Sequence, residues 1–321
     1  MSAQSSLDRA PGQERGTGTA TSGATRERRH RRDRQGLVGL AMVSPAVLLF
    51  TLFLLVPVGL TVVLSFTNAR LISPNPPRFL GLENFVRAFV DDPTFIRSLI
   101  NTFVFAAVVV PVQSALGLAL AVLVNTGVRG VTAFRTMIFM PVVTSMVVVS
   151  ILWSFLYKDD GLINSALSMV TGGADVTIAW LQEPGTALPA IILLSVWQAV
   201  GFHMIIWLSG LQTIDPALYE AADLDGAGGW KKFRYVTWPG LRAIRIFVLV
   251  TITIAALGLF VQVDVMTQGG PLDSTTSLVY HAVRRGYREQ DMGYGAAISL
   301  IFFVLVLAIS LFQRYLTREK D

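Results

Sequence analysis

Histidine and cysteine, the side chains most often used in acid–base, nucleophilic and metal chemistry, are nearly absent from this chain. The 321 residues include three histidines (His30, His203 and His281) and no cysteine. A serine nucleophile would need a histidine within reach, but no recognisable nucleophile motif accompanies His203. The glycines at 226, 228 and 229 lack the spacing of a phosphate-binding loop. The sequence carries no catalytic set, so we expect any nucleotide chemistry to belong to a partner.

Several polar side chains lie inside long apolar stretches, where they are costly to place in hydrocarbon. Such groups normally face a cavity or a partner helix, and they often mark a transport pathway. They are Gln113, Asn125, Gln198, His203, Gln262 and Asp264.

The stretch LLSVWQAVGFHMIIWL, residues 193–208, is the richest in such groups. Within it, residues four apart share a helix face. An aromatic ring beside an amide suits a polyol, because the ring covers the apolar face of a sugar and the amide bonds its hydroxyls. Polar contacts between packed helices are the alternative explanation. The predicted substrate pathway contains Trp197, Gln198, Phe202, His203 and Gln262.

A second polar pattern, YEAADLDGAGGWKKFRYVTWPGL (residues 219–241), separates two apolar runs. Asp215 and Pro216 just before it are typical of a helix start, with the carboxylate as N-cap and the proline in the first turn. Gly226 interrupts the helix where a positive φ carries no Cβ penalty. A second short helix should follow and end at Pro239. The pattern predicts a helix–turn–helix insert that either docks on another protein or lies at lipid headgroups.

The elements that carry these groups are long apolar helices. Apolar residues make up 53% of the chain and charged residues 15%, against about 25% charged residues in soluble domains. At least five segments run about 18 residues or more without Asp, Glu, Lys or Arg, which is typical of membrane-spanning helices. We predict an all-α polytopic membrane protein with about six transmembrane helices. The predicted spans are 38–66, 99–125, 136–157, 187–213, 243–266 and 293–313.

Basic residues predict the orientation of these spans. With six spans, 18 of the 26 Lys and Arg residues lie on the side of both termini and residues 215–241, and 8 lie on the other side. The positive-inside rule places the first side in the cytoplasm. Residues 1–36, rich in Ser, Thr, Gly and Arg, are predicted to be a disordered cytoplasmic tail. Its cluster RERRHRRDR is more typical of affinity for anionic membrane lipid than of nucleic-acid binding.

Three stretches resemble one protein family. EAADLDGAGGWKKFRYVTWPGL resembles the cytoplasmic signature loop of the inner-membrane permease subunits of binding-protein-dependent ABC importers. FLGLENFVRAFVDDPTFIRSLINTFVF and VMTQGGPLDSTTSLVYHAVRRGYREQDMGYGAAISL resemble the carbohydrate branch related to the maltose permease. The likeness covers about residues 37–316 and departs at Trp238, where the family usually has leucine. The matching signature positions are Glu220, Ala221, Ala222, Asp225, Gly226, Ala227, Phe233 and Pro239.

The resemblance implies a type I ABC importer permease fold and a transport role rather than an enzymatic one. The chain would be one of two permease subunits of a heterodimer in the cytoplasmic (inner) membrane. Its signature loop would be the coupling contact with a cytoplasmic ATPase dimer, which would bind ATP and Mg; this chain itself would hold no cofactor. An extracytoplasmic solute-binding protein would deliver a sugar or related polyol to the outer loops around 67–98, 158–186 and 267–292.

The expected organisation has four parts. They are the tail (1–36), a first transmembrane helix with an outer loop (37–98), a core permease domain (99–316) that contains the coupling loop (215–241), and a cytoplasmic C-terminus (317–321). A phosphorylated polyol or another small solute is an alternative substrate. A membrane-embedded enzyme or a secondary transporter is less favoured, because we find neither a catalytic set nor the inverted repeats and midplane charges of secondary transporters.

Overall fold

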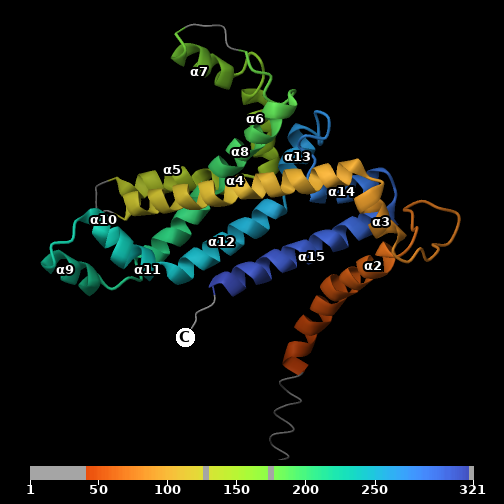
Figure 1. Ribbon diagram of the computed structural model, residues 1–321, viewed down its shortest axis with the longest axis horizontal. Helices are drawn as coiled ribbons and strands as arrows, with labels where there is room; N and C mark the ends of the chain where they lie inside the picture. Colours follow the sequence, from red (N-terminus) through yellow and green to blue (C-terminus); the bar gives the residue numbers. More distant parts are fainter. Residues whose placement is uncertain (1–40, 126–129, 173–176, 318–321) are drawn as a thin grey trace, which may run out of the picture. The chain divides into compact units, whose positions relative to one another are not determined.

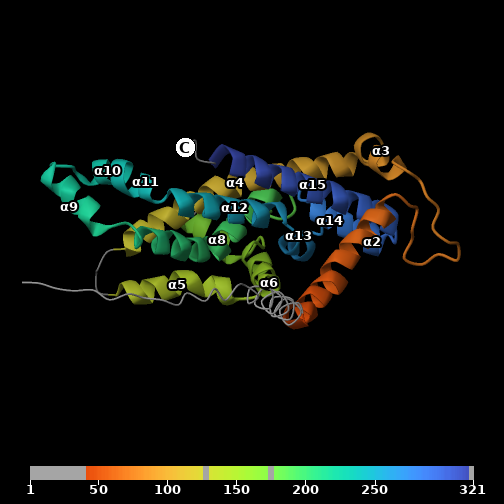
Figure 2. The same ribbon diagram turned by 90° about the horizontal axis from the view of Figure 1, so that it is seen from below.

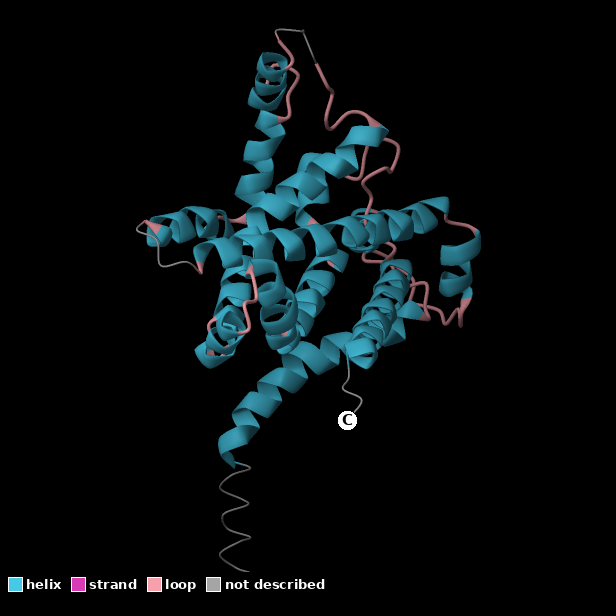
Figure 3. Cartoon of the chain, turned by 60° about the vertical axis from the view of Figure 1, so that its left-hand side comes forward, coloured by secondary structure: helices cyan, strands magenta, loops and turns pink. Residues whose placement is uncertain are grey.

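The computed structural model describes residues 41–125, 130–172 and 177–317. The predicted tail, residues 1–36, lies outside the described residues. The chain divides into two units, residues 1–59 and 60–321, which we describe separately. Helices dominate the described chain (Figure 3), and the described residues include no strand beyond an isolated bridge between Thr67 and Phe79. The predicted all-α class is confirmed.

The first unit contributes one long apolar helix, Ala41–Ser65, which ends in the second unit. It includes a π-helical turn, η1 (Thr51–Leu55), followed by α2 (Val56–Ser65). Its length and composition match the first predicted span.

The second unit holds the remaining helices. In chain order they are α3 (Glu83–Val90), α4 (Pro93–Val124), α5 (Val131–Val143), α6 (Met146–Leu156), α7 (Leu162–Val170), α8 (Pro184–Leu211), α9 (Pro216–Leu224), α10 (Gly229–Lys232), η2 (Phe233–Thr237), α11 (Trp238–Gly240), α12 (Arg242–Leu257), α13 (Val261–Met266), α14 (Leu278–Val283), η3 (Arg284–Arg288) and α15 (Met292–Thr317). The group α9–α11 lies at one end of the long helices, and α3 and α14 lie at the opposite end (Figures 1 and 2).

Among the described residues, five helical segments are long and apolar enough to cross a membrane. They are Ala41–Ser65, Pro93–Val124, Pro184–Leu211, Arg242–Met266 and Met292–Tyr315. The second begins at Pro93 rather than at residue 99, because Asp92 caps it: Oδ1 of Asp92 accepts hydrogen bonds from the backbone amides of Thr94 (3.0 Å) and Phe95 (3.2 Å).

The predicted third span, 136–157, is not one continuous helix. Its two halves, α5 and α6, meet at an angle of 98°. The backbone is extended at Thr144 (ψ 139°) between them. Pro141 lies just before this break, and an internal proline removes a helical hydrogen bond and favours a kink. Counting the bent pair as one span gives six spans, the number that the sequence predicts.

Helices α4 and α8 form the most extensive helix contact of the second unit. Gly117 of α4 permits it, because a Cβ at this position would lie 3.3 Å from Cβ of His203 and 3.3 Å from Cδ1 of Trp207 on α8. Trp207 is fully buried in the main apolar core. This contact fixes the orientation of the polar and aromatic face of α8.

Candidate coupling surface and solute pathway

The first arm of the predicted insert is α9, and both of its ends follow the prediction. Oδ1 of Asp215 accepts a hydrogen bond from the amide of Ala217 at 2.9 Å, and Pro216 occupies the first turn. At the other end, the amide of Ala227 donates a hydrogen bond to the carbonyl of Ala222 (2.9 Å). The amide of Gly226 donates to the carbonyl of Asp223 (3.0 Å). This pair of bonds is a Schellman motif, which places a residue with positive φ after the helix. Gly226 has φ +68°.

The second arm begins at Gly229, but it does not end at Pro239. The helical path continues from α10 through the π-helical turn η2 and α11 before Leu241. Pro239 lies in the first turn of α11, where a missing N–H removes no interior helical bond. The helix ends at Gly240, one residue past the predicted end, and a turn at Leu241 separates it from α12.

Side chains tie the two arms together. Lys232 forms an ion pair with Asp223 across the turn. The hydroxyl groups of Tyr219 and Thr237 are 3.0 Å apart and share a hydrogen bond. These contacts make α9 to α11 a single hairpin, which we call the coupling hairpin (residues 215–241).

A series of stacked side chains joins the coupling hairpin to α12. The ring centroid of Phe233 lies 5.7 Å from that of Trp230 and 6.2 Å from that of Trp238. The guanidinium of Arg245, on α12, lies 4.4 Å from the centroid of Trp238, within the range of a cation–π contact. A force on the hairpin would therefore reach a membrane-spanning helix through packed side chains.

The predicted coupling residues lie on or near the surface of this hairpin. Glu220, Ala221, Asp225, Gly226 and Pro239 are exposed, and Ala222 and Phe233 are half-buried.

Two apolar side chains that the sequence analysis did not select lie beside them. Leu224 is 91% exposed and Trp230 is 75% exposed. Large apolar side chains grouped on an otherwise polar surface are typical of a protein contact. Leu224 could have been found from the sequence, because it is the one large apolar residue in the run ADLDGAGG.

The predicted pathway residues divide into two groups. Trp197 and Phe202 are exposed by 43% and 45%, and Gln262 is half-buried. Gln198 and His203 are buried, and both bond the chain itself: Nε2 of Gln198 donates to the carbonyl of Pro141 (3.4 Å), and Nδ1 of His203 lies 3.0 Å from the carbonyl of Ala199. Contact of these five residues with a solute stays a prediction.

Helix α8 holds the bent pair α5–α6 on both sides of the bend. A Cβ at Gly201 would lie 2.3 Å from the carbonyl oxygen of Ile138, so the backbone of α5 lies directly on this glycine. Gln198 bonds Pro141 just before the bend. Beyond it, the hydroxyl of Tyr157 donates to the carbonyl of Ala190 at 2.9 Å.

Aromatic rings extend this contact outward from α8. The ring centroids of Trp197 and Trp153 are 5.3 Å apart, those of Trp153 and Tyr157 are 5.5 Å apart, and those of Tyr157 and Trp180 are 5.7 Å apart. The sequence analysis missed Trp153, because only the 98° bend brings α6 against this face of α8.

At the end of the helices opposite the coupling hairpin, Asp92 is the centre of a buried polar cluster. Its Oδ2 atom accepts from Nε2 of His281 (2.9 Å), from the guanidinium of Arg285 (3.0 Å) and from the hydroxyl of Tyr294 (2.8 Å). Burial alone would raise the pKa of Asp92, but these hydrogen bonds and the nearby positive charge outweigh it and lower the pKa to about 2.

Although His281 is hydrogen-bonded to Asp92, its pKa is lowered rather than raised. Burial lowers the pKa of His281 below its usual 6.5, and the charges of Arg285 and Arg284 lower it further, although the bond to Asp92 acts to raise it. The imidazole is therefore neutral at pH 7. Its Nδ1 atom is buried without a hydrogen-bond partner, which also disfavours the protonated form.

Further ion pairs surround this cluster. They join Arg87 to Asp291 (2.8 Å), Arg285 to Glu289 (2.6 Å), Arg284 to Asp273 (3.5 Å) and Arg288 to Asp264. Asp264, which the sequence places near the end of an apolar span, lies within α13 and is thus paired with Arg288.

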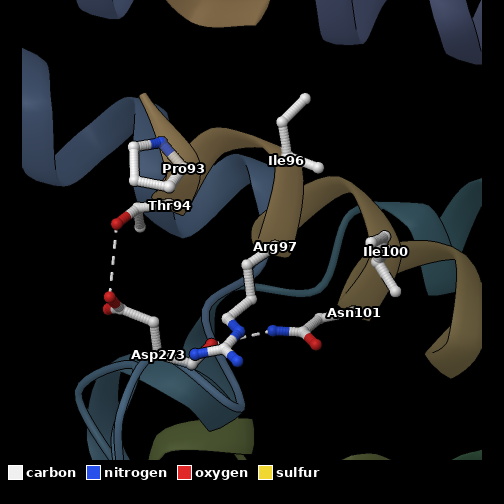
Figure 4. Close-up of a pocket in the computed structure, with 7 residues that line it drawn as sticks. All are labelled: Pro93, Thr94, Ile96, Arg97, Ile100, Asn101 and Asp273. Atoms are coloured by element: carbon white, nitrogen blue, oxygen red, sulfur yellow. Dashed lines mark hydrogen bonds between the residues drawn. The ribbon is translucent and has the colours of Figure 1, made fainter. Parts of the chain in front are cut away.

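A groove of about 670 Å³ opens beside this network (Figure 4). Its polar side chains bond the loop between α13 and α14: Arg97 donates to the carbonyl of Leu272 (2.7 Å), Asn101 to that of Asp273 (2.9 Å), and Thr94 to the carboxylate of Asp273 (3.2 Å). These bonds fix the loop on α4.

Comparison with known proteins identifies the relatives of this chain. The profile of the family described as "Binding-protein-dependent transport system inner membrane component" matches residues 93–320. The chain is 35% identical to the probable ABC transporter permease protein YesP of Bacillus subtilis (strain 168), over 92% of this chain and 94% of that protein. It is 36% identical to the lactose transport system permease protein LacF of Rhizobium radiobacter, over 88% of this chain and 94% of that protein.

A solved structure shares the fold. A chain of a bacterial ABC transporter involved in the import of the acidic polysaccharide alginate superposes with a TM-score of 0.78. The match has 24% sequence identity and covers 91% of this chain and 98% of that chain. The arrangement of helices in this chain is therefore that of an ABC importer permease.

Proposed function

Because this chain belongs to the family of binding-protein-dependent transport system inner membrane components, we propose that it is a permease subunit that imports a sugar or related polyol in an ATP-driven complex. It is a multi-pass membrane protein, a transport subunit rather than an enzyme. In our proposal it pairs with a second permease subunit, and a solute-binding protein supplies the solute from outside the cell.

The coupling hairpin is the single observation that carries this proposal. It contains the signature residues, it is tied internally by Lys232 and Tyr219, and it is joined to α12 through Trp238 and Arg245. Such a hairpin suits a mechanical contact with a separate ATPase dimer, in which ATP and Mg would be bound. Leu224 and Trp230 would provide the apolar part of that contact.

The orientation in the membrane follows the same proposal. The coupling hairpin and both termini would be cytoplasmic, in agreement with the excess of Lys and Arg on that side. The end of the helices that carries α3 and α14, opposite the coupling hairpin (Figure 1), would face the outside. The cluster around Asp92, which includes His281 of α14, would then lie near the docking region of the binding protein.

The substrate proposal rests on α8 and on the relatives. LacF is a lactose transport system permease protein, and the exposed aromatic residues Trp197 and Phe202 lie on α8, the span that also carries Gln198. A phosphorylated polyol is the alternative, and it would need positive charge along the same pathway.

The test is purification of the complex through this chain. We expect an ATPase to copurify, and its hydrolysis in proteoliposomes to rise when a sugar-loaded binding protein is added. Glu220→Lys, which reverses an exposed charge of the hairpin, should weaken this association or abolish the stimulation, because like charges in a contact repel. If no ATPase copurified with this chain under any condition, the proposal would be contradicted.

A further inference from the structure

The two arms of the coupling hairpin carry opposite charge. The first arm, residues 215–226, contains four acidic residues and no basic one. Residues 229–245, which are the second arm and the start of α12, contain five basic residues and no acidic one. The basic residues are Lys231, Lys232, Arg234, Arg242 and Arg245. A charged surface that attracts one arm repels the other, so a single partner does not explain both.

Two of these basic side chains have partners inside the protein. Lys232 is paired with a carboxylate of the first arm, and the guanidinium of Arg245 packs on the ring of Trp238. Lys231 and Arg234 are exposed, and neither forms an ion pair within the part of the chain that the structure describes. The second arm therefore has positive charge available for an outside partner.

The side chain of Arg245 indicates where the second arm meets the membrane. Arg245 belongs to the apolar span Arg242–Met266. Its charged end nevertheless lies 4.4 Å from the ring centroid of Trp238, which is seven residues nearer to the hairpin. Long basic side chains near the end of a span reach back in this way to the headgroup region. The headgroup level is therefore near Trp238, about one helical turn from Arg234 and Tyr235.

Exposed aromatic surface accompanies the positive charge at this level. Tyr235 is 73% exposed, and the guanidinium of Arg234 lies 5.9 Å from the centroid of its ring. Tyrosine is enriched at membrane–water interfaces, because its ring suits acyl chains and its hydroxyl suits water. Further into the span, Phe247 of α12 is 54% exposed. Basic, aromatic and apolar side chains thus follow one another in the order in which a bilayer presents headgroups, interface and hydrocarbon.

We propose that the second arm of the coupling hairpin binds the anionic phospholipid headgroups of the cytoplasmic leaflet. Lys231 and Arg234 would contact the phosphates, and the ring of Tyr235 would lie among the upper acyl chains. The first arm, with the exposed carboxylate of Glu220, and Trp230 near the turn would remain the contact with the ATPase. This inference rests on the cytoplasmic orientation in the proposed function and gives the same hairpin a second partner.

The test uses a spin label at one chosen position, which the lack of cysteine in this chain allows. Tyr235→Cys carries the label on the second arm, and Leu224→Cys carries it at a 91% exposed position of the first arm. The complex purified through this chain is reconstituted into vesicles of phosphatidylcholine, alone or mixed with phosphatidylglycerol. A nickel-chelating headgroup lipid broadens the spectrum of any label that contacts the headgroups. The signal of the unsubstituted complex is subtracted.

We expect broadening at position 235 in vesicles with phosphatidylglycerol, less in phosphatidylcholine alone, and none at position 224. Adding Lys231→Gln and Arg234→Gln together should lower the ratio of contacting to non-contacting label by at least about 5-fold, the factor for one charge near an anionic surface. Adding Lys231→Arg and Arg234→Lys together should preserve the ratio, because both charges remain. Arg78→Gln, which removes an exposed charge from the loop before α3, should also preserve it.

Three outcomes would overturn the inference. One is a lack of broadening at position 235 in vesicles with phosphatidylglycerol. Another is equal broadening in both kinds of vesicle that the double glutamine variant leaves unchanged, which would show an interfacial helix without preference for anionic lipid. The third is loss of the ATPase from the double glutamine variant in detergent, where no bilayer is present, which would assign these charges to the ATPase contact. An unsubstituted complex that purifies without an ATPase would instead contradict the proposed function, and the label at position 235 would still report the lipid contact.

Discussion

The buried carboxylate of Asp92 shows how one residue organises the end of the core that lies opposite the coupling hairpin. Its two oxygens cap α4 and bind groups from α14, η3 and α15. The pair Asp92-Pro93 is typical of a helix start, but our prediction of a span from residue 99 did not use it, and the partners of Asp92 lie almost two hundred residues further along. A local sequence pattern gives no information about contacts between residues so far apart in the chain, so this cluster could not be predicted.

The cluster predicts a pH dependence of stability with two separate windows. In the unfolded chain His281 has its ordinary pKa near 6.5, whereas in the fold burial lowers its pKa. The unfolded state therefore binds the proton more readily, and stability falls as the pH is lowered through 6.5. Asp92, with a folded pKa of about 2 against 3.8, contributes stability that is full above about pH 4 and is lost below it.

The measurement is the melting temperature of the purified protein in detergent between pH 8 and 5. We expect a decline below pH 6.5 that is smaller in His281→Gln, because glutamine can donate to Asp92 without titrating. His30→Gln in the N-terminal tail is the control. An unchanged decline in His281→Gln would show that another group titrates.

Gly226 gives a second prediction at the residue scale. It has φ +68°, and a Cβ there would meet nothing within 4 Å, so only backbone conformation opposes a side chain. A residue with a Cβ costs about 1–2 kcal/mol in this region. Gly226→Val should still insert in the membrane but should lose transport, because the two arms of the coupling hairpin would no longer meet in this geometry.

The control for Gly226 is close by in the chain. Gly228→Ala adds a side chain at φ −69°, also in open space. Sugar uptake and the melting temperature should be near wild type in this variant. Equal uptake in Gly226→Val and Gly228→Ala would show that transport does not depend on the turn at Gly226.

For the helices, the sequence predicted which segments are helical better than it predicted where a helix is broken or continues. Apolar runs identified every span, and Asp215, Pro216 and Gly226 identified both ends of α9. The bend between α5 and α6 was missed, because proline is common in membrane helices and only the packing on α8 shows whether it bends one. The end of the second arm was predicted to within one residue of Gly240, but no sequence pattern indicated the π-helical turn at Phe233–Thr237.

The packing of α8 on α5 can be tested with two glycines of the same helix. Gly201→Ala would place a Cβ 2.3 Å from the carbonyl of Ile138, whereas Gly185→Ala meets nothing within 4 Å. Overpacking of this kind costs about 1–3 kcal/mol. Gly201→Ala should lower the melting temperature and sugar uptake, and Gly185→Ala should change neither. Wild-type behaviour of Gly201→Ala would mean that α5 is free to move away from α8.

For the whole molecule, the orientation in the membrane is the first prediction. The coupling hairpin and α14 lie at opposite ends of the long helices (Figures 1 and 2), and the six-span topology predicted from the sequence puts 18 of the 26 basic residues on the side of the hairpin. Alkaline phosphatase fused after Thr317 should be inactive, and fused after Thr171 it should be active. The reverse pattern would invert the topology and place the hairpin outside the cell.

ATP-driven import can be tested by measuring sugar uptake into proteoliposomes that contain the complex purified through this chain. We expect uptake when the sugar and its binding protein are outside and ATP with Mg is trapped inside. That uptake should be lost with Gly226→Val and should be insensitive to a protonophore, because the ATPase acts through the coupling hairpin. Uptake that proceeds without ATP and collapses when the proton gradient is removed would identify a secondary transporter and would rule out ATP-driven import.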